Sequence, residues 1–185
     1  MGDSLSAGYG ISVKHGWVSL LQDRLDSQGY PYQVINASIS GDTTSGANAR
    51  LDNHLKDTFP EIVIIELGGN DGLRGLSLDE MYQNLSDMIS RLLDQNIRVL
   101  LIPIQIPPNY GQIYTAKFQE VYQRLASAYA EVVLGRFLLE GIALQPELMQ
   151  EDGIHPREEA QTKILDNIWP YLKSILDGNE VLAES

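Results

Sequence analysis

The sequence contains no cysteine, which excludes disulfide bonds, a thiol nucleophile and thiolate metal ligands. Basic residues are also scarce: 13 Lys and Arg stand against 25 Asp and Glu, giving a net charge of −12 without a basic cluster. Nucleic acid is therefore not an expected partner, and an anionic membrane surface would repel the chain on average. No apolar run approaches the roughly 18 residues of a membrane span, and no basic-then-apolar signal segment is present.

The chain of 185 residues is 43% apolar, which fits one globular domain over residues 1–185 with a substantial core. Apolar periodicity predicts alternating helices and buried strands, joined by short connections. This alternation indicates an α/β fold, a parallel sheet with helices on both faces, whose ligands bind beyond the carboxyl ends of the strands. The expected strands are 32–37, 61–67, 97–106 and 132–134. The expected helices are 15–28, one through Leu51, one capped by Ser77 and Glu80, one through Phe118, and one opened by Pro156.

The stretch Gly2-Asp3-Ser4 is the first candidate for chemistry. Glycine adopts backbone conformations that side chains forbid, so a small polar turn can hold Ser4 out at the mouth of a sheet. That position suits a nucleophile. By itself the stretch is more typical of an ordinary turn or helix cap.

A second candidate is the stretch from Asp152 to His155. A carboxylate three residues before an imidazole, in a turn that contains Gly153, can reach Nδ1 and fix the tautomer. Nε2 is then free to take a proton from a hydroxyl, so Ser4, His155 and Asp152 would be nucleophile, base and orienting acid. Alone, this stretch could also be a capped helix start with a structural histidine.

Acyl transfer also needs hydrogen-bond donors for the oxygen that becomes negative. The candidates are the backbone N–H groups of Ser4 and Gly41 and the side-chain amide of Asn70, although the last two residues are also common in plain turns. All of these residues lie in polar loops at expected strand ends, so we expect them to converge. His15 and His54 lie in polar settings and receive no role.

These blocks, in order and spacing, are similar to those of the GDSL serine esterases, also called SGNH hydrolases. They are Gly2-Asp3-Ser4-Leu5-Ser6, Gly41-Asp42, Gly68-Gly69-Asn70-Asp71 and Asp152-Gly153-Ile154-His155. Residues 36–43, 66–75 and 108–111 look like the bacterial thioesterase I, lysophospholipase and arylesterase branch. The resemblance implies a flavodoxin-like three-layer fold with five parallel strands in the order 2-1-3-4-5.

The resemblance also implies a function, the hydrolysis of esters and thioesters of short to medium acyl chains, including lysophospholipids, without metal or cofactor. It implies Ser4, Asp152 and His155 as the triad and Ser4, Gly41 and Asn70 as the oxyanion hole. Leu73, Ile104, Leu139 and Leu144 fall where this branch lines its acyl crevice. A small-molecule ester or thioester is the expected partner, a monomer or weak dimer the expected state, and the periplasm or the exterior the expected location.

The sequence departs from the family before the Gly-Asp-Ser turn, where relatives place the central strand and this chain has only Met1. About five missing apolar residues, at roughly 1.5 to 3 kcal/mol each, would remove about 10 kcal/mol from a stability of about 5 to 15 kcal/mol. We therefore expect a strand upstream of Met1 in the natural protein. Residues 178–185 are expected to form a frayed tail.

Two alternative functions stay open at this stage. One is a narrower SGNH enzyme, a carbohydrate deacetylase, although the apolar stretch 137–144 and the loop 107–110 favour an acyl-chain crevice. The other is a non-catalytic flavodoxin-like binding domain. No dinucleotide-binding glycine motif is present, and Gly41 to Gly46 is followed by Ala47-Asn48 where a phosphate-binding loop requires Lys and Ser or Thr.

Overall fold

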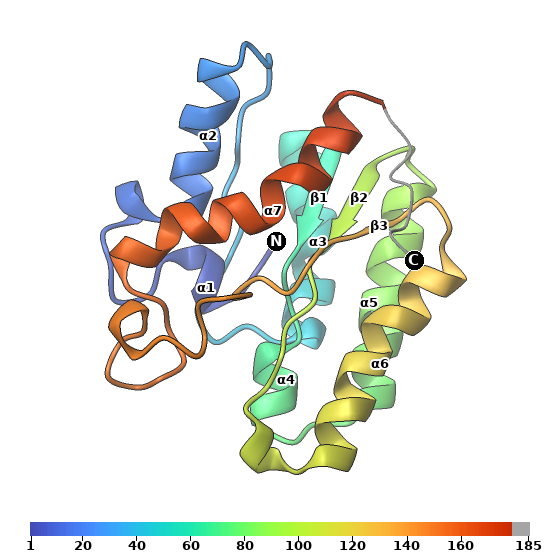
Figure 1. The fold of residues 1–185 in the computed structure, drawn as a ribbon. Coiled ribbons are helices and arrows are strands. Elements are labelled where there is room, and N and C mark those ends of the chain that lie inside the picture. Colours follow the sequence, from blue (N-terminus) through green and yellow to red (C-terminus); the bar gives the residue numbers. More distant parts are fainter. Residues whose placement is uncertain (179–185) are drawn as a thin grey trace.

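The computed structural model describes residues 1–178 and has an α/β fold built on a parallel sheet (Figure 1). The strands are β1 (Ile62–Ile65), β2 (Arg98–Leu101) and β3 (Val133–Leu134), in the order β1-β2-β3. They lie within three of the predicted apolar runs. The predicted strand 97–106 forms a ladder only as far as Leu101, where the pairing with both β1 and β3 ends.

The predicted helices are all present, although the last begins later than expected. Ser77 caps its helix by accepting a hydrogen bond from the Glu80 N–H, as the sequence predicts. Pro156 does not open the last helix, because it pairs with Met149 in an isolated bridge. The long helices are α2 (Trp17–Ser27), α3 (Thr44–Thr58), α5 (Leu78–Leu93), α6 (Gln112–Ala128) and α7 (Gln161–Leu176). The short ones are α1 (Ser4–Ala7), α4 (Gly69–Leu73), η1 (Val13–His15), η2 (Pro108–Tyr110), η3 (Pro146–Leu148) and η4 (Glu158–Ala160).

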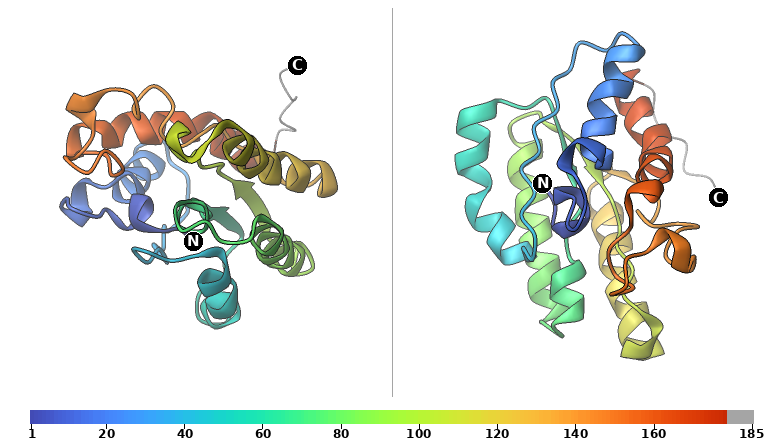
Figure 2. Two further views of the ribbon diagram at one scale, coloured as in Figure 1. Left: turned by 90° about the horizontal axis from the view of Figure 1, so that it is seen from below. Right: turned by 90° about the vertical axis from the view of Figure 1, so that its left-hand side faces the viewer.

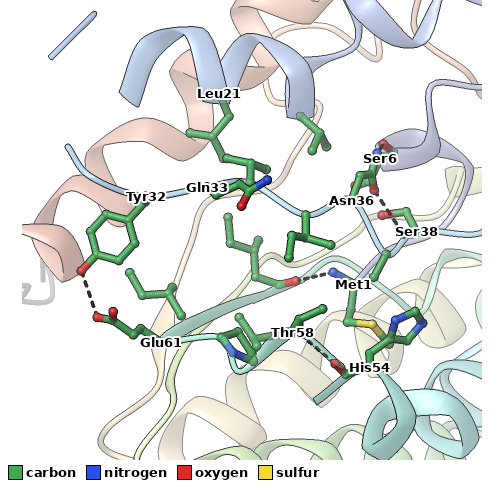
Figure 3. Close-up of a pocket in the computed structure, with 18 of the residues that line it drawn as sticks. Met1, Ser6, Leu21, Tyr32, Gln33, Asn36, Ser38, His54, Thr58 and Glu61 are labelled. Carbon is green, nitrogen blue, oxygen red and sulfur yellow. Dashed lines mark hydrogen bonds between the residues drawn. The ribbon is translucent and has the colours of Figure 1, made fainter. Parts of the chain in front are cut away.

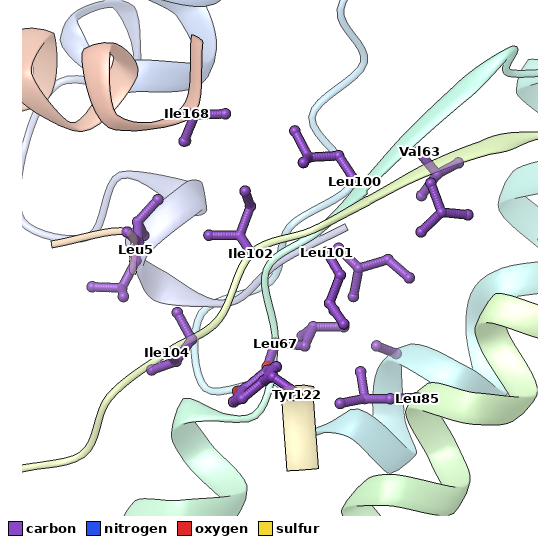
Figure 4. Packing of buried hydrophobic residues seen from close by; sticks show 14 of the residues in the cluster. Leu5, Val63, Leu67, Leu85, Leu100, Leu101, Ile102, Ile104, Tyr122 and Ile168 are labelled. Carbon is purple, nitrogen blue, oxygen red and sulfur yellow. The ribbon is translucent and has the colours of Figure 1, made fainter. Parts of the chain in front are cut away.

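The helices form layers on the two faces of the sheet (Figures 1 and 2). Helices α2 and α7 pack together on one face, whereas α3 and α5 pack together on the other, with α6 beside α5. Figure 4 shows Ile168 of α7 and Leu85 of α5 on opposite sides of the strand residues Leu100 and Leu101. All four side chains are buried. Burial on both faces explains why the strands read as continuous apolar runs rather than as alternating ones.

The sheet differs from the expected five strands on the β1 side. Met1 and Gly2 lie beside β1, where Gly2 forms a parallel bridge with Glu66 and the Met1 carbonyl accepts a hydrogen bond from the Glu66 N–H at 2.9 Å. Residues 32–37 form no strand. The Ile39 N–H donates to the Gly2 carbonyl at 3.0 Å, which places the segment that follows 32–37 beside residues 1–2. The spatial order from this segment through residues 1–2 to β1, β2 and β3 therefore matches the expected order 2-1-3-4-5. Since a ladder needs a neighbour of similar length, the two residues beside β1 are too few to order 32–37.

A groove of about 330 Å³ runs between β1 and residues 31–38 (Figure 3). Leu21, Val34 and Ile64 are among the apolar side chains that line it, and Met1 lies at one end. The Met1 amine donates to the Ile64 carbonyl at 3.0 Å, and burial lowers its pKa from 8.0 to about 6. The position beside β1 is therefore occupied only at its end nearest Ser4.

None of the helices within residues 1–178 combines the length and the apolar character that crossing a membrane requires. The predicted frayed tail falls almost wholly on residues 179–185, which lie outside the described part of the chain.

Candidate active site

Ser4 is the first residue of α1, a single helical turn at the end of the short stretch beside β1. The Asp3 side chain caps this turn by accepting a hydrogen bond from the Leu5 N–H at 3.0 Å. Gly2 is required by close packing, since a Cβ there would lie 2.8 Å from Glu66 Oε2. The turn thus presents a half-buried Ser4 at the carboxyl end of the sheet, as predicted.

The residues predicted as a triad lie together, although 151 positions separate Ser4 from His155. Ser4 Oγ lies 2.8 Å from His155 Nε2, and His155 Nδ1 lies 2.7 Å from Asp152 Oδ2. Both distances are within hydrogen-bond reach for a nucleophile, a base and a group that orients the base. The arrangement can therefore move a proton from the serine hydroxyl to the imidazole.

Asp152 is held as an anion by the loop that carries it. Partial burial acts to raise its pKa, but hydrogen bonds from the His155 backbone and ring and from the Ile154 N–H outweigh this and lower the pKa from 3.8 to about 2. Oδ1 accepts both backbone N–H groups, at 2.9 and 3.0 Å, which leaves Oδ2 for the imidazole. With the carboxylate ionised, Nδ1 keeps its hydrogen and Nε2 is the free acceptor.

The other two predicted oxyanion donors come from the loop before α3 and from the short helix α4. Gly41 has a φ of 81°, a conformation that favours glycine, and its carbonyl accepts a hydrogen bond from Arg74 at 2.8 Å. Asn70 lies in α4, and its Nδ2 donates to Asp3 Oδ2 at 3.1 Å. The loop before α3 also contacts α1 directly, because Asn36 Nδ2 donates to the Ser6 carbonyl at 2.8 Å.

Two buried carboxyl groups lie directly behind the Ser4 turn. Burial raises the pKa of Asp3 from 3.8 to about 6, although the Leu5 N–H, His155 and Asn70 oppose the rise. Burial and the charge of Asp3 raise the pKa of Glu66 well above its usual range. Glu66 Oε2 accepts a hydrogen bond from Ser6 Oγ at 2.5 Å. With a pKa of about 6, the Asp3 carboxyl group is mostly ionised at neutral pH.

The four residues predicted to line an acyl crevice occupy different environments. Leu73 is half-buried in α4, and its carbonyl accepts a hydrogen bond from the Tyr110 hydroxyl at 3.0 Å. Ile104 and Leu139 are buried, with exposed fractions of 4% and 6%. Leu144 is 95% exposed. Ile104 packs behind α4, since a Cβ on Gly69 would lie 3.5 Å from its Cγ2.

Sequence reasoning missed several contacts around the candidate site. The Tyr9 ring lies against the His155 ring, with centroids 4.4 Å apart. Gln150 holds this region by donating to the carbonyls of Tyr9 and Pro156 at 2.8 and 3.1 Å. Only the position of Tyr9, five residues after Ser4, could have indicated its proximity. Within residues 1–178, no group of three His, Cys, Asp or Glu side chains is placed to hold a metal ion.

Comparisons with known proteins place the chain in one family. Residues 1–163 match the profile of the GDSL-like lipase/acylhydrolase family. The chain is 48% identical to Esterase TesA of Pseudomonas aeruginosa over 95% of this chain and 87% of that protein. It is 43% identical to Thioesterase 1/protease 1/lysophospholipase L1 of Escherichia coli K12, over 90% and 78%. The crystal structure of the psychrotrophic esterase EstA from Pseudoalteromonas sp., inhibited by monoethylphosphonate, superimposes with a TM-score of 0.91 at 40% identity, covering 96% of each chain.

Proposed function

The chain belongs to the GDSL-like lipase/acylhydrolase family, and we propose that it is a serine esterase that uses Ser4 to hydrolyse carboxylic esters and acyl thioesters. The observation that carries the proposal is the continuous series of contacts from Ser4 Oγ through His155 to Asp152, at 2.8 and 2.7 Å. We propose short to medium acyl chains as substrates, with lysophospholipids among them. We also propose that residues 1–185 form one hydrolase domain, and that the enzyme acts in the periplasm or outside the cell.

In the first half of the reaction, Ser4 Oγ attacks the acyl carbon while His155 Nε2 takes the hydroxyl proton. The carbonyl oxygen becomes negative and accepts hydrogen bonds from the Ser4 and Gly41 N–H groups and from Asn70 Nδ2. When the tetrahedral species collapses, the bond to the leaving group breaks and His155 gives its proton to the departing alcohol or thiol. Ser4 is then acylated.

In the second half, a water molecule gives a proton to Nε2 as its oxygen attacks the acyl-enzyme carbon. Collapse returns the proton to Ser4 Oγ and releases the carboxylic acid. Asp152 remains ionised throughout, because its pKa lies at about 2. Its anion stabilises the imidazolium that forms in both halves.

The first test is covalent labelling with an alkyl fluorophosphonate, read by intact-protein mass spectrometry and peptide mapping. We expect one adduct, on Ser4, in the wild type and in a Ser12→Ala control, and none in Ser4→Ala. Ser12 is a suitable control because it is exposed and takes no part in the hydrogen bonds that join Ser4, His155 and Asp152. A folded wild-type chain that takes no adduct would contradict the proposal and favour a binding domain.

The second test concerns the substrate class. Hydrolysis of a nitrophenyl ester series from acetyl to dodecanoyl is compared with that of acyl-thioesters, lysophospholipids and acetylated sugars. We expect kcat/KM to rise from acetyl to medium chain lengths. A preference for acetylated sugars would instead identify a carbohydrate deacetylase.

A further inference from the structure

The Asp3 carboxylate connects two parts of the candidate oxyanion hole. Its side chain is almost completely buried, with an exposed fraction of 3%. Oδ1 accepts a hydrogen bond from the Leu5 N–H at 3.0 Å and so holds the turn that begins with Ser4. Oδ2 accepts one from Asn70 Nδ2 at 3.1 Å, across 67 positions of the chain. One carboxylate thus contacts the segments that carry two of the donors assigned to the hole.

The contact with Asp3 decides which way the Asn70 amide faces. An ionised carboxylate only accepts hydrogen bonds, so it must face the amide nitrogen and not the amide oxygen. Rotating the amide by half a turn would place oxygen against oxygen in a buried site, where an unsatisfied polar group is costly. Nδ2 carries two hydrogens. When one of these hydrogens is donated to Asp3 in a hydrogen bond, the direction of the other is fixed, and it remains available to a substrate oxygen.

We propose that Asp3 is a positioning residue that orients the Asn70 amide and the Ser4 turn before substrate binds, so that the oxyanion hole is formed in the free enzyme. This inference rests on the proposed function, in which Asn70 and Ser4 are oxyanion donors. Donors that are already oriented need no reorganisation when charge develops on the substrate, which is the main source of their effect on the barrier. Asp3 itself touches neither the substrate nor the proton that is transferred.

The charge state of the site supports this role. Asp3 faces Glu66 at the end of β1, His155 in the loop before η4 and Asp42 in the loop before α3. Burial and the charge of Asp3 raise the pKa of Glu66 well above its usual range, whereas the pKa of Asp3 lies at about 6. Asp3 is therefore an anion at neutral pH. Protonating it below about pH 6 removes the charge that holds the Asn70 nitrogen in place.

The test is a double-mutant cycle of Asp3→Asn and Asn70→Ala, measured on a short nitrophenyl ester. In the wild-type background, Asp3→Asn should lower kcat by about 10- to 100-fold, which is less than the roughly 10²- to 10³-fold loss expected on removing an oxyanion donor. KM should stay within about threefold. In the Asn70→Ala background the same change should lower kcat by less than about threefold, since the amide that Asp3 orients is gone.

Glu66→Gln is the matched control, because it alters the neighbouring buried acid and leaves the acceptor of Asn70 unchanged. It should keep kcat within about threefold of the wild type. Equal losses from Asp3→Asn in both backgrounds would overturn the inference, because they would show a general structural effect. A loss in Glu66→Gln as large as that in Asp3→Asn would overturn it as well.

A second readout does not depend on catalysis. The side-chain amide resonances of Asn70 in ¹⁵N–¹H spectra should shift with pH with a midpoint near the Asp3 pKa of about 6, and this shift should be absent in Asp3→Asn. Amide resonances that do not respond to pH would overturn the inference. If the wild type neither hydrolyses esters nor takes a phosphonate adduct, the proposed function fails, and the amide titration alone then decides whether Asp3 orients Asn70.

Discussion

Replacing Asp152 with Asn should damage the enzyme through the tautomer of His155 more than through the lost charge. In the wild type, Oδ1 accepts the backbone N–H groups of Ile154 and His155, and Oδ2 accepts from Nδ1. Asn has one oxygen. If that oxygen keeps the two backbone bonds, the NH₂ group faces Nδ1 and makes it an acceptor. The hydrogen of the neutral ring then lies on Nε2, which can no longer take the Ser4 proton.

The expected magnitude follows from the role and from the exposure of Asp152. A comparable change in a buried triad costs about 10⁴-fold in kcat, or about 5.5 kcal/mol. The Asp152 side chain is 40% exposed, so water can compete for Nδ1 and recover part of the loss. We expect kcat to fall by about 10³- to 10⁴-fold with KM little changed. Asp152→Ala, which leaves Nδ1 open to water, should be no worse than Asp152→Asn.

The assay is steady-state hydrolysis of a short nitrophenyl ester, together with the rate of fluorophosphonate labelling at Ser4. Thermal unfolding of each variant provides the control, and Asp152→Asn should melt close to the wild type because the backbone bonds are kept. A folded Asp152→Asn variant that retained kcat within tenfold of the wild type would refute the reasoning. So would an Asp152→Ala variant that was much less active than Asp152→Asn.

Three further outcomes are expected. Because burial raises the pKa of Asp3 from 3.8 to about 6, the folded chain binds more protons than the unfolded chain between these pH values, so the free energy of unfolding should fall as pH rises from 4 to 6. This decrease in the free energy of unfolding should be about 3 kcal/mol at most. Urea titrations at several pH values measure it, and an equal decrease in Asp3→Asn would contradict the assignment to Asp3. Joining an extended apolar segment before Met1 should fill the groove and raise the melting temperature. The free energy of unfolding should rise by about 1.5 to 3 kcal/mol for each side chain that becomes buried. A Gly/Ser segment of equal length should raise neither. Tyr9→Ala should lower kcat about 2- to 10-fold through the lost contact with His155, and Tyr9→Phe should restore it. An unchanged kcat in Tyr9→Ala would show that this contact has no catalytic effect.

The parts of the structure that could be predicted from the sequence are those set by local interactions. The Ser77–Glu80 cap is made within one helical turn, so its residue types suffice to predict it. The contact between Asp152 and His155 spans three positions in a single loop, and the sequence predicted that pairing as well. The buried strands were predictable because burial on both faces requires continuous apolar runs.

Residues 32–37 show where local pattern fails. Val34 and Ile35 favour a strand, but a strand forms only where a neighbouring segment pairs with it. Only Met1 and Gly2 lie in the position between this segment and β1. The segment therefore lines a groove instead of pairing. The resemblance to the family predicted the shortage of chain at this position.

The sequence by itself determined the fold class, the parallel strands and the identity of the candidate nucleophile, base and orienting acid. Only the tertiary structure decided which groups meet across long separations in the chain. It placed the Tyr9 ring against the imidazole of His155, and Asp3 against Asn70 and Glu66. These contacts join residues that lie on separate elements, so no local pattern in the sequence specifies them. The same burial raises the pKa values of Asp3 and Glu66, because removal from water disfavours the charged form of a carboxyl group.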